Sequence, residues 1–249
     1  MKMTTRFAFV AAGLTLATMS AAVGETLYFE DFAGGDVSHS SVWTDYTGGT
    51  SSAAAGDLVL AETPLGMVTA PTGVSAVETL SNVSVRTRVN FAGTPIESAG
   101  VAIVANGDAS VRNSYYQGGI NPDNNNLYIN WNEGFDSTNF AFVESGFDFS
   151  GGEEIVLQFD VAGNELSLTA WRPGEAMPAT PQLQYTDDAV LLPPGIPGLL
   201  FDGGGDADAS ATFRYFHVAS QPIPEPATCM LLAAATALAF ARVAIVGRR

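Results

Sequence analysis

A strict alternation of apolar and polar residues in the middle of the chain restricts the fold most strongly. Residues 84–91 read SVRTRVNF, with Val, Thr, Val and Phe at the odd positions and Arg, Arg and Asn at the even positions from 86 onward. A period of two is that of a β-strand and excludes an amphipathic helix. One apolar and one polar face are typical of an antiparallel sheet with one side in water.

The remaining body repeats this β character. Residues 155–161 and 165–171 flank Ala162, Gly163 and Asn164, which predicts a hairpin with a short Gly-Asn turn. Further strands are expected at residues 27–32, 57–60, 100–105, 127–131, 195–201 and 212–218. Many short strands without a helical period predict an all-β, antiparallel two-sheet sandwich over residues 25–220.

The first 24 residues have the organisation of a signal peptide. Lys2 and Arg6 form a positive start, residues 7–17 are apolar except for Thr15, and small residues follow. Cleavage is expected after Ala22 or after Gly24. The body is therefore predicted to be exported.

The last 29 residues predict a membrane segment. Residues 227–247 form a run of 21 residues that is apolar except near its end, long enough as a helix to cross about 30 Å of hydrocarbon. Arg242 lies near one end, where its side chain can reach the interface, and Arg248 and Arg249 close the chain. The positive-inside rule places these arginines in the cytoplasm and the body outside.

The charge of the body limits its partners. Residues 25–220 hold 25 acidic residues against five arginines, which leaves −20. Such a surface repels nucleic acid and anionic lipid, and it suits a secreted protein that stays soluble, binds cations or lives among neutral polysaccharides. The single cysteine, Cys229, lies in the tail, so the body folds without an internal disulfide.

The tail resembles a known sorting signal. Pro224, Glu225 and Pro226 directly precede the apolar run and the basic end. This order over residues 221–249 resembles the PEP-CTERM signal of bacterial surface proteins, which is also filed as an ice-binding protein C-terminal domain. The resemblance implies that an exosortase-type membrane transpeptidase recognises the triplet and processes the chain. It also implies a final location at the cell surface, in the outer envelope or in an exopolysaccharide matrix.

The body resembles a second family. The segments that carry the likeness are residues 28–32, Trp43, and residues 56–60, 83–91, 163–171 and 213–218. Their order resembles the concanavalin A-like, laminin-G-like jelly roll. The resemblance implies carbohydrate binding, in some members with calcium, and adjacent first and last strands, with Phe29 and Phe32 packed near Phe213 and Phe216.

Aromatic residues near an asparagine-rich loop are the preferred ligand candidates. Sugars stack on aromatic rings beside polar groups that fix their orientation. The loop comprises residues 121–126, and the candidates around it are Tyr115, Tyr116, Tyr128 and Trp131. Core packing is the alternative role for each of them.

A glycine-rich turn is the candidate calcium site. Asp202, Asp206 and Asp208 place three carboxylates within seven residues, and calcium prefers oxygen ligands from flexible loops. A solvated acidic turn is the alternative.

Catalysis has little support in the sequence. No Glu-x-Asp-x-x-Glu string occurs, and the pairs Glu153-Glu154 and Asp187-Asp188 are adjacent residues, which point to opposite faces of a strand. The two histidines, His39 and His217, form no recognisable triad or zinc motif. The sequence thus predicts a non-enzymatic, exported surface or matrix protein that binds carbohydrate or supports the envelope. The alternatives are a glycoside hydrolase on the same fold and a purely structural matrix component.

Overall fold

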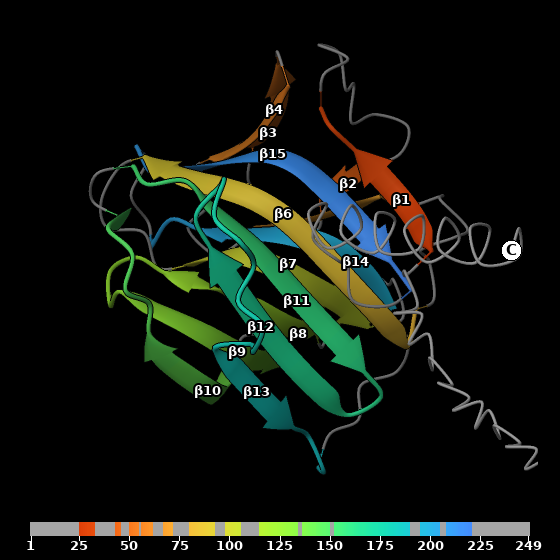
Figure 1. Cartoon of the computed structure of the whole chain (residues 1–249). Helices are drawn as coiled ribbons and strands as arrows, with labels where there is room; N and C mark the ends of the chain where they lie inside the picture. The colour runs from red at the N-terminus through yellow and green to blue at the C-terminus, as the bar shows by residue number, and fades with distance from the viewer. Residues whose placement is uncertain are drawn as a thin grey trace, which may run out of the picture.

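The structure is a computed structural model of the whole chain, shown in Figure 1. It describes residues 25–32, 43–45, 50–54, 56–61, 67–71, 80–92, 98–105, 115–133, 136–149, 152–189, 195–204 and 208–220. The predicted signal peptide and sorting tail lie outside these residues, as do His39 and Asp206. Within the described part of the chain, no helix is long and apolar enough to cross a membrane.

The strands form two antiparallel sheets that face each other (Figure 1). The eight-stranded sheet has the order β13 (Leu183–Thr186), β12 (Glu165–Trp171), β11 (Ile155–Ala162), β6 (Asn82–Ala92), β15 (Ser210–Ala219), β4 (Asp57–Ala61) and β3 (Thr50–Ala54), and β1 (Thr26–Glu30) also pairs with β15. The seven-stranded sheet has the order β10 (Asp136–Glu144), β9 (Asn126–Glu133), β8 (Tyr115–Asn121), β7 (Ser98–Ala105), β14 (Gly195–Asp202), β5 (Met67–Pro71) and β2 (Trp43–Asp45). The predicted all-β antiparallel sandwich is confirmed.

Each strand predicted from the sequence is present. In the predicted hairpin, Ala162 lies opposite Glu165, so the turn consists of Gly163 and Asn164. Gly163 has a φ of 62°, which glycine adopts without steric cost. The patterns in the sequence did not predict β2, β3, β5, β8, β10 and β13.

The core lies between the inner faces of the two sheets. In β6, Val85, Thr87 and Val89 are fully buried, as the alternation predicts. Phe159 from β11 packs among them, and Phe213 and Phe216 come from β15. Trp43 lies 5.2 Å from Phe216 between ring centroids and extends the aromatic core.

The first and last strands pair, as the family resemblance implies. Thr26 lies opposite Ala219, and just beyond the strands the amide of Ser220 donates to the carbonyl of Glu25. Phe32 is fully buried and contacts Trp43. The expectation for Phe29 is wrong: it faces away from the core and is 55% exposed, because it alternates with Tyr28, whose ring packs toward Phe216.

The polar face of β6 is less exposed to solvent than the sequence predicts. Arg86 is buried, and its guanidinium lies 5.1 Å from the ring centroid of Trp171. The connection between β12 and β13, residues 172–182, supplies Met177, whose sulfur accepts a hydrogen bond from Arg86. Gln182 anchors this connection by donating to, and accepting from, the backbone of Ala170. The connection therefore covers part of the outer face of the eight-stranded sheet.

Candidate functional site

The outer face of the seven-stranded sheet carries a set of polar and aromatic side chains. In β9, Leu127 and Ile129 point into the core, so Tyr128 and Asn130 point outward. In β8, Tyr116 and Ile120 belong to the core, so residues 115, 117 and 119 point outward. This alternation places Tyr115, Gln117, Tyr128 and Asn130 on one surface.

Cross-strand register brings these side chains together. Gln117 lies directly opposite Asn130, and Gly119 lies directly opposite Tyr128. Side chains at directly opposed positions are immediate neighbours. The Gln117 amide donates to the Tyr128 hydroxyl, and both residues are buried although they face away from the core.

Asn130 supplies an unused acceptor at this position. Its side-chain oxygen is buried and has no hydrogen-bond partner among the residues that the structure describes. A buried polar atom without a partner carries a desolvation cost of about 1–3 kcal/mol. A ligand hydroxyl that donates to this oxygen would remove the cost.

Two paired glycines form the floor beside Tyr128. Gly119 lies opposite Gly100 of β7. A Cβ atom on Gly119 would lie 2.6 Å from the Ala99 carbonyl oxygen and 2.8 Å from the Tyr128 hydroxyl. Glycine at this position therefore allows the tyrosine ring to lie over the sheet.

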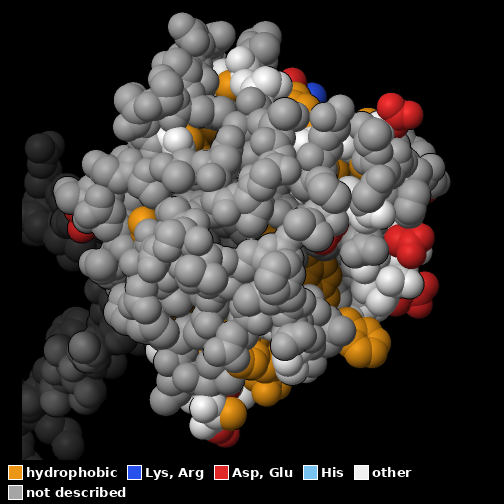
Figure 2. All heavy atoms as spheres, turned by 180° about the vertical axis from the view of Figure 1, so that it is seen from behind, with side chains coloured by type: hydrophobic (Ala, Val, Ile, Leu, Met, Phe, Trp, Pro, Cys, Tyr) orange, Lys and Arg blue, Asp and Glu red, His pale blue; other side chains and the backbone are white. Residues whose placement is uncertain are grey.

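Exposure on this face increases toward the edge strand β10. Leu200 on β14 and Tyr128 on β9 are buried, whereas Phe142, which lies opposite Tyr128 on β10, is 68% exposed. Figure 2 looks onto this side of the molecule and shows hydrophobic side chains at the surface at its lower right. The exposed part of this face described by the structure therefore lies at the edge strand β10.

Carboxyl groups are almost absent from the central strands of this sheet. Among the residues of β7, β8, β9 and β14, the acids are Glu133 and Asp202, each the last residue of its strand. Glycoside hydrolysis ordinarily needs two carboxyl groups about 5–10 Å apart around the scissile bond.

The four predicted ligand residues do not form one cluster. Tyr116 packs in the core, and its hydroxyl donates to the buried carboxylate of Asp187 at 2.6 Å. Trp131 lies opposite Tyr116 and packs against the core as well. Strand alternation directs both side chains inward, which agrees with the alternative role of core packing. Tyr115 and Tyr128 remain on the outer face.

The predicted asparagine-rich loop is a tight turn that is held by its own hydrogen bonds. The Asn121 side-chain oxygen accepts from the amide of Asn124, and Ser145 donates through its amide and hydroxyl to Asn125. The amides that face the candidate site are Gln117 and Asn130, inside the strands. Asn130 could have been found from the sequence, because it lies two residues after Tyr128 and therefore on the same face of β9. Gln117 could not, because the sequence did not predict β8.

The predicted calcium turn is described only in part. Asp202 ends β14 and accepts a hydrogen bond from the amide of Gly204, while Asp208 is exposed shortly before β15. Asp206 lies outside the described residues. Within those residues, no group of three His, Cys, Asp or Glu side chains is arranged to hold a metal ion.

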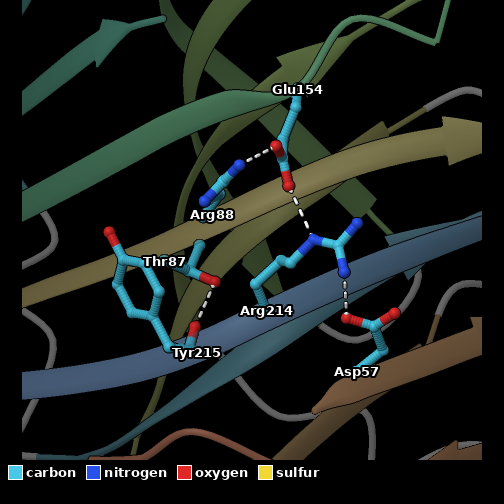
Figure 3. A network of polar contacts seen from close by, with 6 residues as sticks. All are labelled: Asp57, Thr87, Arg88, Glu154, Arg214 and Tyr215. Atoms are coloured by element: carbon cyan, nitrogen blue, oxygen red, sulfur yellow. Dashed lines mark hydrogen bonds and ion pairs between the residues drawn. The ribbon is translucent and has the colours of Figure 1, made fainter. Parts of the chain in front are cut away.

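The other acidic pairs considered for catalysis have structural partners. Glu153 pairs with Arg172, and Glu154 pairs with both Arg88 and Arg214. Figure 3 shows the ion pairs of Glu154, and in this network Arg214 also contacts Asp57 of β4 at 2.6 Å. Burial raises the pKa of Glu154, but the hydrogen bonds from the two arginines outweigh this effect and leave the pKa below its usual value.

His217 and Asp160 lie on the outer face of the eight-stranded sheet. Burial, and to a smaller extent the charge of Arg86, lowers the pKa of His217. Burial raises the pKa of Asp160, which accepts hydrogen bonds from Ser84 and Gln158. Both groups are hydrogen-bonded to neighbouring side chains; for His217 the partner is Thr26, whose Oγ1 lies 3.0 Å from Nε2.

Comparison with known proteins identifies the fold of the chain but not its family or function. No protein-family model matches the sequence, and no curated protein matches it. Solved structures share the two-sheet jelly roll.

Three of these structures illustrate the likeness. The carbohydrate binding module CBM66 from Bacillus subtilis has a TM-score of 0.52 and 13% identity, over 70% of this chain and 92% of the module. A β-1,3-1,4-glucanase (lichenase) derived from a mouse hindgut metagenome has a TM-score of 0.55 and 13% identity, over 79% of this chain and 99% of the enzyme. The exoplasmic/lumenal domain of VIP36, solved with Ca²⁺ and Man3GlcNAc, has a TM-score of 0.55 and 12% identity, over 80% of this chain and 92% of that domain. Identity this low shows a common fold alone.

Proposed function

We propose that the body binds a neutral carbohydrate on the outer face of the seven-stranded sheet, without hydrolysing it. The observation that carries the proposal is the side-by-side placement of Gln117, Asn130 and Tyr128 on one surface. Amide side chains both donate and accept hydrogen bonds, which suits sugar hydroxyls. Tyr128 beside them is buried, and Phe142, which lies opposite it and is 68% exposed, would offer an apolar face to a sugar ring.

The buried side-chain oxygen of Asn130 is a hydrogen-bond acceptor, so we expect the ligand to supply a hydrogen-bond donor at this position. A sugar hydroxyl placed there would donate to Asn130 and accept from a neighbouring amide. Phe142 at the open edge would contact the next sugar unit of a chain. The net charge of −20 on the body opposes binding of acidic polymers.

A binding role is favoured over hydrolysis by the positions of the acids. Asp160 lies on the opposite sheet, and Asp187 is buried and hydrogen-bonded to Tyr116. Neither reaches the Gln117–Asn130 pair from its described place in the fold. Of the acids on β7, β8, β9 and β14, Glu133 and Asp202 each end their strand and lie away from the centre of the sheet.

Electrophoresis of the full chain in native gels that contain a soluble polysaccharide tests this proposal. Barley β-1,3-1,4-glucan and xylan are the probes, because both are neutral or nearly neutral chains. We expect the protein to be retarded by at least one of them, and Asn130→Ala to weaken the apparent association constant about tenfold, as expected for loss of a buried hydrogen bond.

Asn124→Ala is the matched control, since Asn124 lies in the neighbouring turn with an exposed side chain. It should migrate like the wild-type protein. Equal retardation of wild type and Asn130→Ala, or release of reducing sugar from either probe, would contradict the proposed binding role.

We further propose that the tail is a PEP-CTERM sorting signal and that the chain is exported and then processed by an exosortase-type transpeptidase. The support is the order of Pro224, Glu225 and Pro226, the apolar run and the terminal arginines. Two prolines keep the triplet extended and rigid in front of the membrane segment. The body would then be displayed at the cell surface or in the surrounding matrix.

The intact mass and terminal sequence of the protein isolated from its native envelope test the sorting proposal. We expect the mature protein to begin after Ala22 or Gly24 and to lack the residues after the Pro-Glu-Pro triplet. A C-terminus intact through Arg249 would exclude processing and leave a permanent single-pass anchor.

A further inference from the structure

An exposed aromatic surface lies where β1 meets β15, on the sheet opposite to the proposed carbohydrate site. Phe29 of β1 lies directly opposite His217 of β15. It is 55% exposed, which is unusual for a phenylalanine on a paired strand. Exposure of the Phe29 side chain to water therefore carries a free-energy cost in the isolated body. A ligand that covers this surface would remove that cost.

The rings beside Phe29 extend this surface. The centroids of Phe29 and Tyr215 are 6.3 Å apart, and the ring planes differ by only 25°. His217 meets Phe29 edge-on at 5.6 Å and is held by its hydrogen bond with Thr26. We call Phe29, Tyr215 and His217 the aromatic platform. The stacked rings come from adjacent strands and form an apolar surface of which the Phe29 side chain is the most exposed part.

The charges next to the platform cancel one another. Figure 3 shows Tyr215 beside the network of Arg88, Glu154, Arg214 and Asp57, in which two arginines face two carboxylates. The Arg214 guanidinium is held at 2.7 Å from Glu154 and 2.6 Å from Asp57. The two positive and two negative charges of these groups balance one another, and the groups offer fixed hydrogen-bond donors and acceptors beside the platform.

We propose that the aromatic platform binds an insoluble neutral polysaccharide by stacking against its sugar rings. The carbon-bound hydrogens of a pyranose form an apolar face that matches an aromatic ring, while its hydroxyls meet the paired charges at the rim. Because Phe29 is exposed on a paired strand, the platform is accessible to chains packed at the surface of a solid. The site is separate from the Gln117–Asn130 pair and does not depend on it.

Adsorption of the full chain, kept soluble in a polyoxyethylene detergent, tests the proposal. Microcrystalline cellulose and insoluble β-1,3-glucan are the probes, and depletion of protein from solution gives the isotherm. We expect adsorption to at least one probe that 1 M NaCl does not remove, because stacking is not screened by salt. Phe29→Ala should weaken the association constant at least tenfold, and Phe29→Trp should preserve or strengthen it.

Val143→Ala is the matched control, because it truncates an exposed apolar side chain on the other sheet that has no part in the Gln117–Asn130 site. It should adsorb like the wild-type protein. Two results would overturn the platform: no adsorption of the wild-type chain to either probe, or equal adsorption of wild type and Phe29→Ala. A dimer in sedimentation velocity that Phe29→Ala abolishes, without adsorption, would show that a second copy covers the platform instead.

The same variants separate this proposal from the soluble-chain site. If only Asn130→Ala changes migration in glucan gels and Phe29→Ala leaves adsorption unchanged, the platform fails and the first site stands. If Asn130→Ala changes nothing and Phe29→Ala abolishes adsorption, the first site fails and the platform stands.

Discussion

At the scale of single residues, the alternation of side chains along a strand decides which of them are available to a ligand. Tyr115 and Tyr116 are neighbours in sequence, yet Tyr116 is part of the core and Tyr115 is not. Similarly, Trp131 faces inward and Asn130 faces outward. Aromatic residues counted along the sequence therefore overestimate the size of a binding surface, because a period of two directs half of them into the core.

Glycines at three positions of the seven-stranded sheet are required by close packing. Gly118 points into the core, where an added Cβ would overlap the ring of Phe159. Gly119 points outward under Tyr128, and Gly100 lies against the backbone of residues 118 and 119. Small residues thus shape both the core side and the ligand side of β8.

Substitution of Gly118 tests this packing directly. Gly118→Ala should lower the free energy of unfolding by about 1–3 kcal/mol, because the extra methyl group overpacks the core against Phe159. Urea denaturation measures the change. In Gly118→Ala/Phe159→Leu the smaller side chain leaves room for the methyl group, so the double variant should lose less stability than the two single changes add up to. Strict additivity would show that the methyl group does not contact Phe159.

At the scale of strands, ion pairs join four elements of the eight-stranded sheet. Glu154 precedes β11 and pairs with Arg88 of β6 and Arg214 of β15, and Arg214 continues to Asp57 of β4. A single carboxylate that accepts from two arginines is more constrained than an isolated surface pair. Glu154 therefore connects strands that are far apart in sequence.

The pH dependence of stability follows from the lowered pKa of Glu154. A carboxyl group whose folded pKa is depressed contributes stability above its unfolded pKa of about 4.5 and loses that contribution as the pH falls through the folded value. Glu154→Gln should cost about 0.5–1 kcal/mol at neutral pH, the upper part of the range for partly exposed pairs. Thermal unfolding from pH 7 to pH 3 should show the two proteins converging in acid.

Glu175→Gln serves as the matched control, since Glu175 is exposed on the connection between β12 and β13. Its melting temperature should follow that of the wild-type protein over the same pH range. A constant difference between wild type and Glu154→Gln down to pH 3 would mean that the network does not depend on the charge of Glu154.

At the scale of the whole molecule, the last strand completes the larger sheet. β15 pairs with β6 along most of its length and with both β4 and β1 on its other side. Four of the largest buried residues around it are aromatic: Phe32, Phe159, Phe213 and Phe216. β15 therefore joins β6 to β4 and β1 within the larger sheet and supplies two of these buried rings, Phe213 and Phe216.

A pair of truncated chains tests this dependence. Residues 25–220 should unfold in one cooperative transition, because both sheets and the β1–β15 pair are retained. Residues 25–208 should show no such transition, because loss of β15 separates β6 from β4 and exposes the core. Circular dichroism during heating and limited proteolysis distinguish the two outcomes. Cooperative unfolding of residues 25–208 would mean that the remaining strands form a stable sandwich.

The sequence by itself determined the local features of this protein. Alternation in residues 84–91 assigned the inward and outward faces of β6 correctly, and the Gly-Asn pair located the β11–β12 turn. These features depend on neighbouring residues and on the intrinsic preferences of glycine and of β-branched side chains. The class of fold followed from them because short amphipathic strands must bury their apolar faces against a second sheet.

The candidate surfaces were decided only by the tertiary structure. Gln117 meets Asn130, and Phe29 meets Tyr215, because of a cross-strand register that joins residues up to 186 positions apart. Register depends on the pairing of whole strands, and a shift of one residue would reverse every face. The dry environment of Arg86 likewise depends on residues 172–182 folding back over the sheet. Such long-range contacts leave no local pattern in the sequence, which is why the inward direction of Tyr116 and Trp131 became apparent only when their strands were placed.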